Sequence, residues 1–240
     1  MNRSRQGRGG QSAASRPRRG RESAAARASR AEALARTLAA AYPHAACSLD
    51  FASPFQLLVA TILSAQCTDK RVNLVTPTLF ARWPDPAVLA AAKPRDLEAV
   101  IRSTGFFRAK AKSILGCCRA LVDRHGGEVP ETLDDLVKLP GVGRKTANVV
   151  LGSAFGIASG VVVDTHVGRI SRRLGLTRHA DAVRAEQDLV RCLPRDRWIA
   201  FSHHLIEHGR TVCTARSPRC EGCPLADLCP RVGVPPRRKG

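Results

Sequence analysis

Four cysteines near the C-terminal end constrain the fold of this chain more than any other feature. They follow the pattern C-x6-C-x2-C-x5-C, at Cys213, Cys220, Cys223 and Cys229. Four soft thiolates within one short loop form a closed metal site. The spacing lacks the paired CxxC knuckles of a zinc ribbon, so it favours a cubane [4Fe–4S] cluster. A structural zinc ion, which also takes four thiolates, stays the main alternative.

The remaining cysteines argue against a disulfide framework. The chain has nine cysteines, an odd number, and no uninterrupted apolar segment follows the N-terminal charges as it would in a signal peptide. Scattered free thiols are typical of a reducing compartment, where cysteine behaves as a small buried hydrophobe. Five cysteines lack ligand spacing: Cys47, Cys67, Cys117, Cys118 and Cys192.

The charge of the chain indicates a polyanionic partner. The formal net charge is +19 over 240 residues, and binding to a phosphate backbone releases counterions. No stretch approaches the apolar length of a membrane span, so we expect nucleic acid and no membrane.

Part of this charge lies in an N-terminal segment. Residues 1–30 hold nine arginines and one glutamate with almost no large apolar residue, so we predict a disordered basic tail. A solvated extension, a non-specific DNA-binding arm and a transit peptide are the three interpretations.

Helix signals dominate the rest of the chain. An Ala/Leu-rich helix is predicted over Glu32–Ala41. Ser53 and Pro54 are predicted to be the N-cap and first residue of a second helix. Thr132 with Asp135 resembles a capping box that opens a further helix. Only Val161–Val163 looks strand-like. The predicted fold class is therefore all-α.

The string LPGVGRKTANVV predicts a helix-hairpin-helix module. Glycine permits the tight turn, and the free N–H groups of the following helix can bind a DNA phosphate. The expected DNA contacts of this hairpin are Gly141, Val142, Gly143 and Arg144.

Lys145 lies at the start of that second helix, where the positive helix end disfavours the ammonium form. A nucleophilic lysine needs the neutral amine, although a solvated charge is the simpler interpretation. Asp164, after an apolar run, is by itself best interpreted as a helix N-cap.

Together these motifs resemble the endonuclease III family of DNA base-excision glycosylases. The resemblance covers essentially everything after residue 30. The matching segments, in family order, are LSAQCTDKRVN, STGFFRAKA, LPGVGRKTANVVL, VDTHVGRI and the four-cysteine loop.

The resemblance implies two helical domains with the active site in the cleft between them. A six-helix barrel would span residues 47–157. Residues 31–46 and 158–240 would form a discontinuous domain that holds the [4Fe–4S] cluster.

The resemblance also assigns roles. Lys145 and Asp164 fall on the family's catalytic lysine and aspartate, Gln66 on the residue that fills the gap left by a flipped nucleotide, and Phe106 where relatives place an apolar wedge. Asp69 is a weaker polar candidate near the pocket. Further expected DNA contacts are Thr165, His166, Arg216 and Arg219.

The activity implied is that of a bifunctional glycosylase and abasic-site lyase acting on oxidised pyrimidines in duplex DNA. We expect a monomer in a bacterial cytoplasm, associated with the nucleoid. The alternatives are an adenine, mismatch or pyrimidine-dimer glycosylase of the same superfamily, and a non-enzymatic iron–sulfur DNA-binding protein. Lys145 argues against an adenine glycosylase, because members of that group lack a lysine at this position. The Lys145/Asp164 pair argues against a protein that only binds DNA, which would not need it.

Overall fold

The computed structural model describes residues 22–234, which are helix and loop throughout, so the all-α prediction is confirmed. Within this range no helix is both long and apolar enough to span a bilayer. The α-helices are α1 Ala24–Ala41, α2 Pro54–Leu63, α3 Asp69–Arg82, α4 Pro86–Ala90, α5 Pro94–Ile101, α6 Phe107–His125, α7 Leu133–Leu136, α8 Arg144–Phe155, α9 Thr165–Arg173, α10 Ala182–Cys192 and α11 Trp198–Thr211, and the 3-10 helices are η1 Arg102–Thr104 and η2 Arg195–Arg197.

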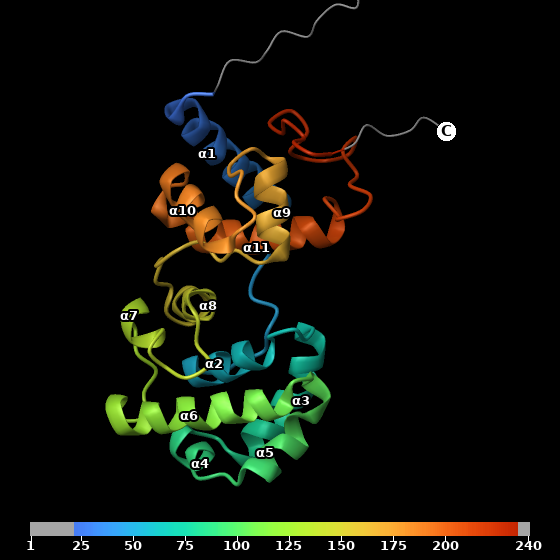
Figure 1. Cartoon of the computed structure of the whole chain (residues 1–240). Helices are drawn as coiled ribbons and strands as arrows, with labels where there is room; N and C mark the ends of the chain where they lie inside the picture. The colour runs from blue at the N-terminus through green and yellow to red at the C-terminus, as the bar shows by residue number, and fades with distance from the viewer. Residues whose placement is uncertain (1–21, 235–240) are drawn as a thin grey trace, which may run out of the picture.

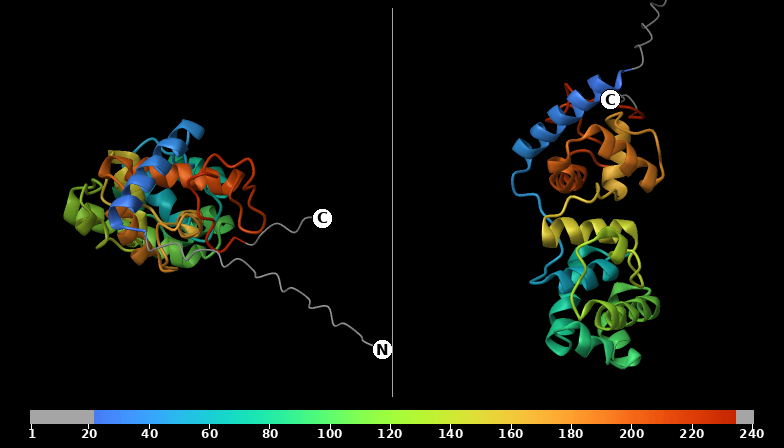
Figure 2. Two further views of the ribbon diagram at one scale, coloured as in Figure 1. Left: turned by 90° about the horizontal axis from the view of Figure 1, so that it is seen from above. Right: turned by 90° about the vertical axis from the view of Figure 1, so that its left-hand side faces the viewer.

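The helices are arranged in two lobes (Figure 1). Helices α2 to α8 form one lobe, and α1, α9, α10, α11 and the cysteine loop form the other. The chain passes between the lobes twice, before α2 and after α8, so the second lobe is discontinuous in sequence (Figure 2). This two-lobed arrangement resembles the expected division, whose boundaries at 47–157, 31–46 and 158–240 stay a prediction.

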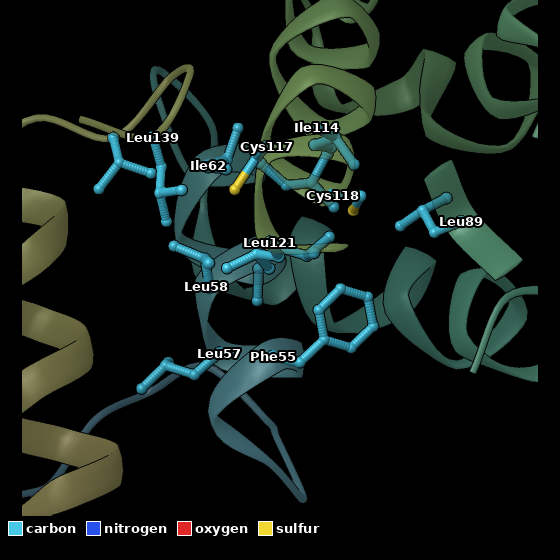
Figure 3. Packing of buried hydrophobic residues seen from close by; sticks show 14 of the residues in the cluster. Phe55, Leu57, Leu58, Ile62, Leu89, Ile114, Cys117, Cys118, Leu121 and Leu139 are labelled. Atoms are coloured by element: carbon cyan, nitrogen blue, oxygen red, sulfur yellow. The ribbon is translucent and has the colours of Figure 1, made fainter. Parts of the chain in front are cut away.

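Each lobe has its own hydrophobic core. In the first lobe Phe55, Leu58 and Ile114 pack with two buried thiols, Cys117 and Cys118 (Figure 3). The second core gathers residues from α1, α9, α10 and α11, with Phe201 almost fully buried at its centre. A cleft between two separately packed cores can bind a ligand without disturbing either of them.

Local capping signals set several helix ends as predicted. The Ser53 hydroxyl accepts the N–H of Gln56 at 3.2 Å, and Pro54 is the first residue of α2. The Thr132 hydroxyl accepts the N–H of Asp135 at 3.2 Å, which confirms the N-cap of the capping box. The extended segment at residues 161–163, by contrast, pairs with no strand in the described part of the chain. Val161 and Val163 are instead buried in the second core.

The first helix begins earlier than predicted. Ser23 caps it through the N–H of Ala26 at 3.1 Å, so the expected disorder is wrong for residues 24–30. Arg30 stabilises this part of the helix by donating to the carbonyl of Leu174 at 2.6 Å. This segment is rich in alanine and arginine, which favour helix, so the N-cap and the tertiary contact extend a helix that local preference already supports. The remainder of the expected tail, residues 1–21, lies outside the described residues.

A buried carboxylate joins the two lobes. Glu186 of α10 is 5% exposed and accepts two hydrogen bonds from Arg144 of α8, at 2.8 and 3.1 Å, and one from Asn148 at 2.9 Å. Asn148 in turn accepts the Ser159 hydroxyl at 2.8 Å. A Cβ on Gly160 would lie 2.1 Å from the Glu186 carboxylate, so the linker passes tightly over the network. Each of these contacts restricts the position of α8 relative to the second lobe.

We predict that Glu186→Gln lowers the free energy of unfolding by about 1–3 kcal/mol, because one buried donor loses its charged acceptor. Chemical denaturation followed by circular dichroism measures this. Glu131→Gln, at an exposed position, is the matched control and should change stability by less than about 0.5 kcal/mol. Equal effects of the two substitutions would contradict the prediction.

Candidate active site

The hairpin before α8 is built on close backbone approach. Gly141 has a φ of +77°, and a Cβ there would lie 2.6 Å from the Cβ of Ser113. Glycine is therefore required both by the backbone conformation and by space. Val142 is 6% exposed and anchors the turn in the first core. Gly143 is the N-cap of α8 and brings no side chain to the helix start, so the first N–H groups of α8 form a site suited to an anion.

Lys145 is the second residue of α8, and Asp164 is the N-cap of α9. The Asp164 Oδ1 accepts the N–H of Val167 at 2.7 Å, which confirms the N-cap interpretation. This hydrogen bond also restricts rotation of the carboxylate. Although the two residues belong to different lobes, both line the same cavity.

This cavity has a volume of about 330 Å³ and lies between the lobes. The first lobe contributes Gln66, Asp69 and Lys145, and the second contributes Asp164 and Arg210. Amine, carboxylate and amide groups thus line one cavity. A convergent polar set in a cleft is the arrangement expected of a catalytic site.

Sequence reasoning missed the ion pair at the edge of this cavity. Arg210 of α11 donates to Asp69 at 2.8 Å and to the Ser48 hydroxyl at 2.9 Å. Asp69 is the first residue of α3, whose N-cap is Thr68. Asp69 and Arg210 are 141 residues apart in the chain, so no local pattern predicts that they meet.

His203 is a second residue of the cavity wall that the motifs did not indicate as part of this site. Burial lowers the pKa of its imidazole, with a smaller effect from the neighbouring His204. At neutral pH the cavity therefore has an uncharged ring on one side, which can donate or accept a hydrogen bond according to its tautomer.

Gln66 and Phe106 have unusual backbones. Their φ angles are +52° and +49°, in the left-handed region that non-glycine residues rarely adopt. Gln66 is exposed, and the Phe106 ring is 66% exposed. Phe106 therefore lies outside the core of the first lobe, where its ring is accessible to a partner.

The other expected DNA contacts have different surroundings. Thr165 is the exposed first residue of α9. His166 packs against Gly209, where a Cβ would lie 2.6 Å from its Nδ1, and it is 3.3 Å from Arg169 Nη2. Arg144 is engaged by Glu186 and is only partly available to a phosphate.

The four cysteines line one common cavity in the second lobe: Cys213, Cys220, Cys223 and Cys229. Among residues 22–234, no three His, Cys, Asp or Glu side chains are grouped closely enough to hold a single metal ion. Because all four cysteines line this one cavity, their thiols can serve as the ligands of a single cluster. This donor set suits an iron–sulfur cluster, which these four residues would hold.

Arginine side chains organise the backbone of the cysteine loop. Arg173 donates to the Sγ of Cys213 at 3.2 Å and to the carbonyls of Thr214 and Ala215 at 2.7 and 2.8 Å. Arg169 donates to the carbonyl of Cys213 at 3.0 Å. A loop without regular structure thereby satisfies its backbone acceptors.

Beside the loop, His208 is 1% exposed, and burial lowers its pKa to about 4. Its Nδ1 lies 2.7 Å from the Tyr42 hydroxyl and its Nε2 lies 3.7 Å from the Sγ of Cys223. On the outside of the loop Arg216 and Arg219 are exposed, where they can reach a phosphate.

Comparisons with known proteins agree with both sites. Residues 59–195 match the model of HhH-GPD superfamily base excision DNA repair proteins, and residues 213–229 match the iron–sulfur binding domain of endonuclease III. The second match coincides with the span of the four cysteines, which confirms the iron–sulfur prediction over zinc.

Relatives cover most of the chain. Endonuclease III of Synechocystis sp. is 59% identical over 79% of this chain and 86% of its own. Endonuclease III of Escherichia coli K12 is 42% identical over 78% of this chain and 88% of its own. A trapped endonuclease III–DNA covalent intermediate superposes with a TM-score of 0.77 at 45% identity, covering 82% of this chain and 92% of that one.

We predict that Arg173→Met lowers the amount of iron retained per chain, because several loop acceptors lose their donor. Iron and sulfide analysis of the purified protein, with its visible absorption, measures this. Arg172→Met, one residue away and making none of these contacts, is the control and should retain iron as the wild type does. Unchanged iron in Arg173→Met would contradict the prediction.

Proposed function

Because the chain belongs to the endonuclease III family of the HhH-GPD superfamily, we propose that it is a bifunctional DNA glycosylase and abasic-site lyase of base excision repair. Its substrates are oxidised pyrimidines in duplex DNA. The observation that carries this function is the placement of Lys145 and Asp164 on one cavity between the lobes.

In this proposal the damaged nucleotide is flipped out of the duplex into the cavity. Damage weakens stacking, so a lesion is extruded at lower cost than a normal base. The start of α8 binds the phosphate backbone of the DNA. The hairpin residues that make this contact are Gly141, Val142, Gly143 and Arg144. Phe106 wedges into the duplex, and Gln66 fills the space that the nucleotide leaves.

The chemistry follows from the two catalytic groups. The Lys145 Nζ attacks C1′ of the deoxyribose and the base departs. Asp164 stabilises the positive charge that develops on the sugar and assists proton transfer. The C1′–O4′ bond then opens to give a protonated Schiff base at C1′. This acidifies the C2′ hydrogen, and β-elimination expels the 3′ phosphate and so cleaves the strand 3′ to the lesion. A solved relative trapped as a covalent intermediate with DNA supports an enzyme that bonds to its substrate.

The remaining contacts are proposed as phosphate contacts outside the cavity: Thr165, His166, Arg216 and Arg219. The cluster held by the four cysteines shapes the loop that bears the two arginines. Since the named relatives are bacterial and the chain is strongly basic, we propose that it acts in the cytoplasm on nucleoid DNA.

Borohydride trapping tests the nucleophile. We predict a covalent protein–DNA adduct on two duplexes, one with thymine glycol and one with an abasic site, and none with Lys145→Gln, because an amide cannot form the Schiff base. Binding of the variant to abasic DNA should persist and shows that it is folded. An undiminished adduct in the variant would mean that another amine attacks. An adduct on the abasic duplex alone would support the lyase activity. It would also mean that the excised base is not an oxidised pyrimidine, and pyrimidine dimers and mismatched bases would be tested next.

The catalytic role of the Asp164 charge and the capping role of its side chain can be separated by two substitutions. Asparagine is as good an N-cap as aspartate, so Asp164→Asn should keep the stability of the protein while base excision falls by about 100-fold or more, the scale of a lost acid–base group. Asp164→Ala should add a loss of about 1 kcal/mol in stability. Single-turnover excision and thermal denaturation measure the two effects. Full activity in Asp164→Asn would show that the residue is only a cap.

A further inference from the structure

A buried ammonium group lies outside the catalytic cavity and has no role in the proposed chemistry. Lys110, in the first turn of α6, is 5% exposed. Its Nζ donates to the carbonyl of Leu63 at 2.8 Å and to the carbonyl of Thr104 at 2.7 Å. None of the ion pairs found within residues 22–234 includes it. Burial lowers the pKa of this amine.

The two carbonyls belong to two different loops. Leu63 is the last residue of α2 and leads into the loop that contains Gln66, whereas Thr104 ends η1 directly before Gly105 and Phe106. Carbonyls at helix ends have no partner within the helix. One ammonium group therefore ties the base of the Gln66 loop to the base of the Phe106 loop.

Both loops contain strained backbone. Only three non-glycine residues of the described chain have positive φ, and two of them are Gln66 and Phe106. Such conformations persist only where the surrounding contacts enforce them. The Lys110 hydrogen bonds supply a contact of this kind at the root of each loop.

The same groups share one hollow on the surface. A cavity of about 220 Å³ is lined by Gln66, Phe106, Lys110 and the hairpin glycine Gly141. The two strained residues thus line one hollow together with the hairpin glycine. Burying an ammonium without a carboxylate is costly, and an apolar side chain would fill the space without that cost. A retained lysine is explained by its ability to hold two carbonyls at once.

We propose that Lys110 is a positioning residue that fixes the two inserting loops relative to each other, so that extruding the nucleotide and filling the gap behind it occur as one step. This inference rests on the proposed function, in which Gln66 and Phe106 enter the duplex. Lys110 itself touches neither the sugar nor the base.

The test separates extrusion from chemistry. Lys110→Met is compared with wild type, as cluster-loaded full chains, on a thymine glycol duplex and on a single-stranded abasic oligonucleotide. The single strand has no stacked nucleotide to extrude. We expect single-turnover excision from the duplex to fall roughly 10- to 100-fold, because small misplacements of positioning groups cost rate on that scale. Borohydride trapping on the single strand should change by less than about 3-fold.

Three further measurements complete the experiment. The exposed Lys112→Met, on the same helix, is the matched control and should leave both reactions unchanged. Lys110→Gln, which keeps a donor, should give an intermediate loss. The fluorescence of 2-aminopurine placed opposite the lesion reports unstacking and should rise less in Lys110→Met than in wild type.

The outcomes are distinguishable. Equal losses on duplex and single strand would reduce Lys110 to a general structural residue and overturn the inference, as would full duplex activity in Lys110→Met. Should Lys110→Met fail to fold, the same comparison made with Lys110→Gln decides. A wild type that traps neither substrate would overturn the proposed function and this inference with it.

Discussion

The structure depends on the buried carboxylate of Glu186, which holds α8 against the second lobe. Its partner Arg144 directly precedes Lys145, so the network that joins the lobes also sets the position of the proposed nucleophile. Asp164 approaches from the other side and is held by its own capping hydrogen bond. An active site between two lobes needs both supports, because neither core alone determines the distance across the cleft.

The cysteine loop also depends on side chains from a neighbouring element. Its backbone has no helix or strand to satisfy its carbonyls, and Arg169 and Arg173 supply the donors from α9. Because Asp164 is the N-cap of α9, one short helix connects the cleft between the lobes to the loop that would hold the cluster. The capping aspartate at its start and the two arginines near its end thus serve different sites through one rigid element.

Much of this architecture was predictable from local chemistry. Ser53, Thr132 and Asp164 are side chains whose capping role depends on neighbours three residues away, and the structure places all three as predicted. The contacts that close the cleft were not predictable. Arg210 meets Asp69 only because the lobes bring distant segments together. The early start of α1 was missed although its signals are local, since Ser23 caps a segment rich in the helix-forming residues alanine and arginine.

The residues that depart from local preference lie mostly along one edge of the first lobe. Three features there each lower the stability of the folded chain when taken singly. They are the left-handed backbone of Gln66 and Phe106, the exposed Phe106 ring, and the buried Lys110, which has no ion-pair partner among the described residues. A chain under selection for stability alone would replace them with residues that suit their positions. Their occurrence around one hollow beside the hairpin is therefore best explained by what that edge must do when a duplex is pressed against it.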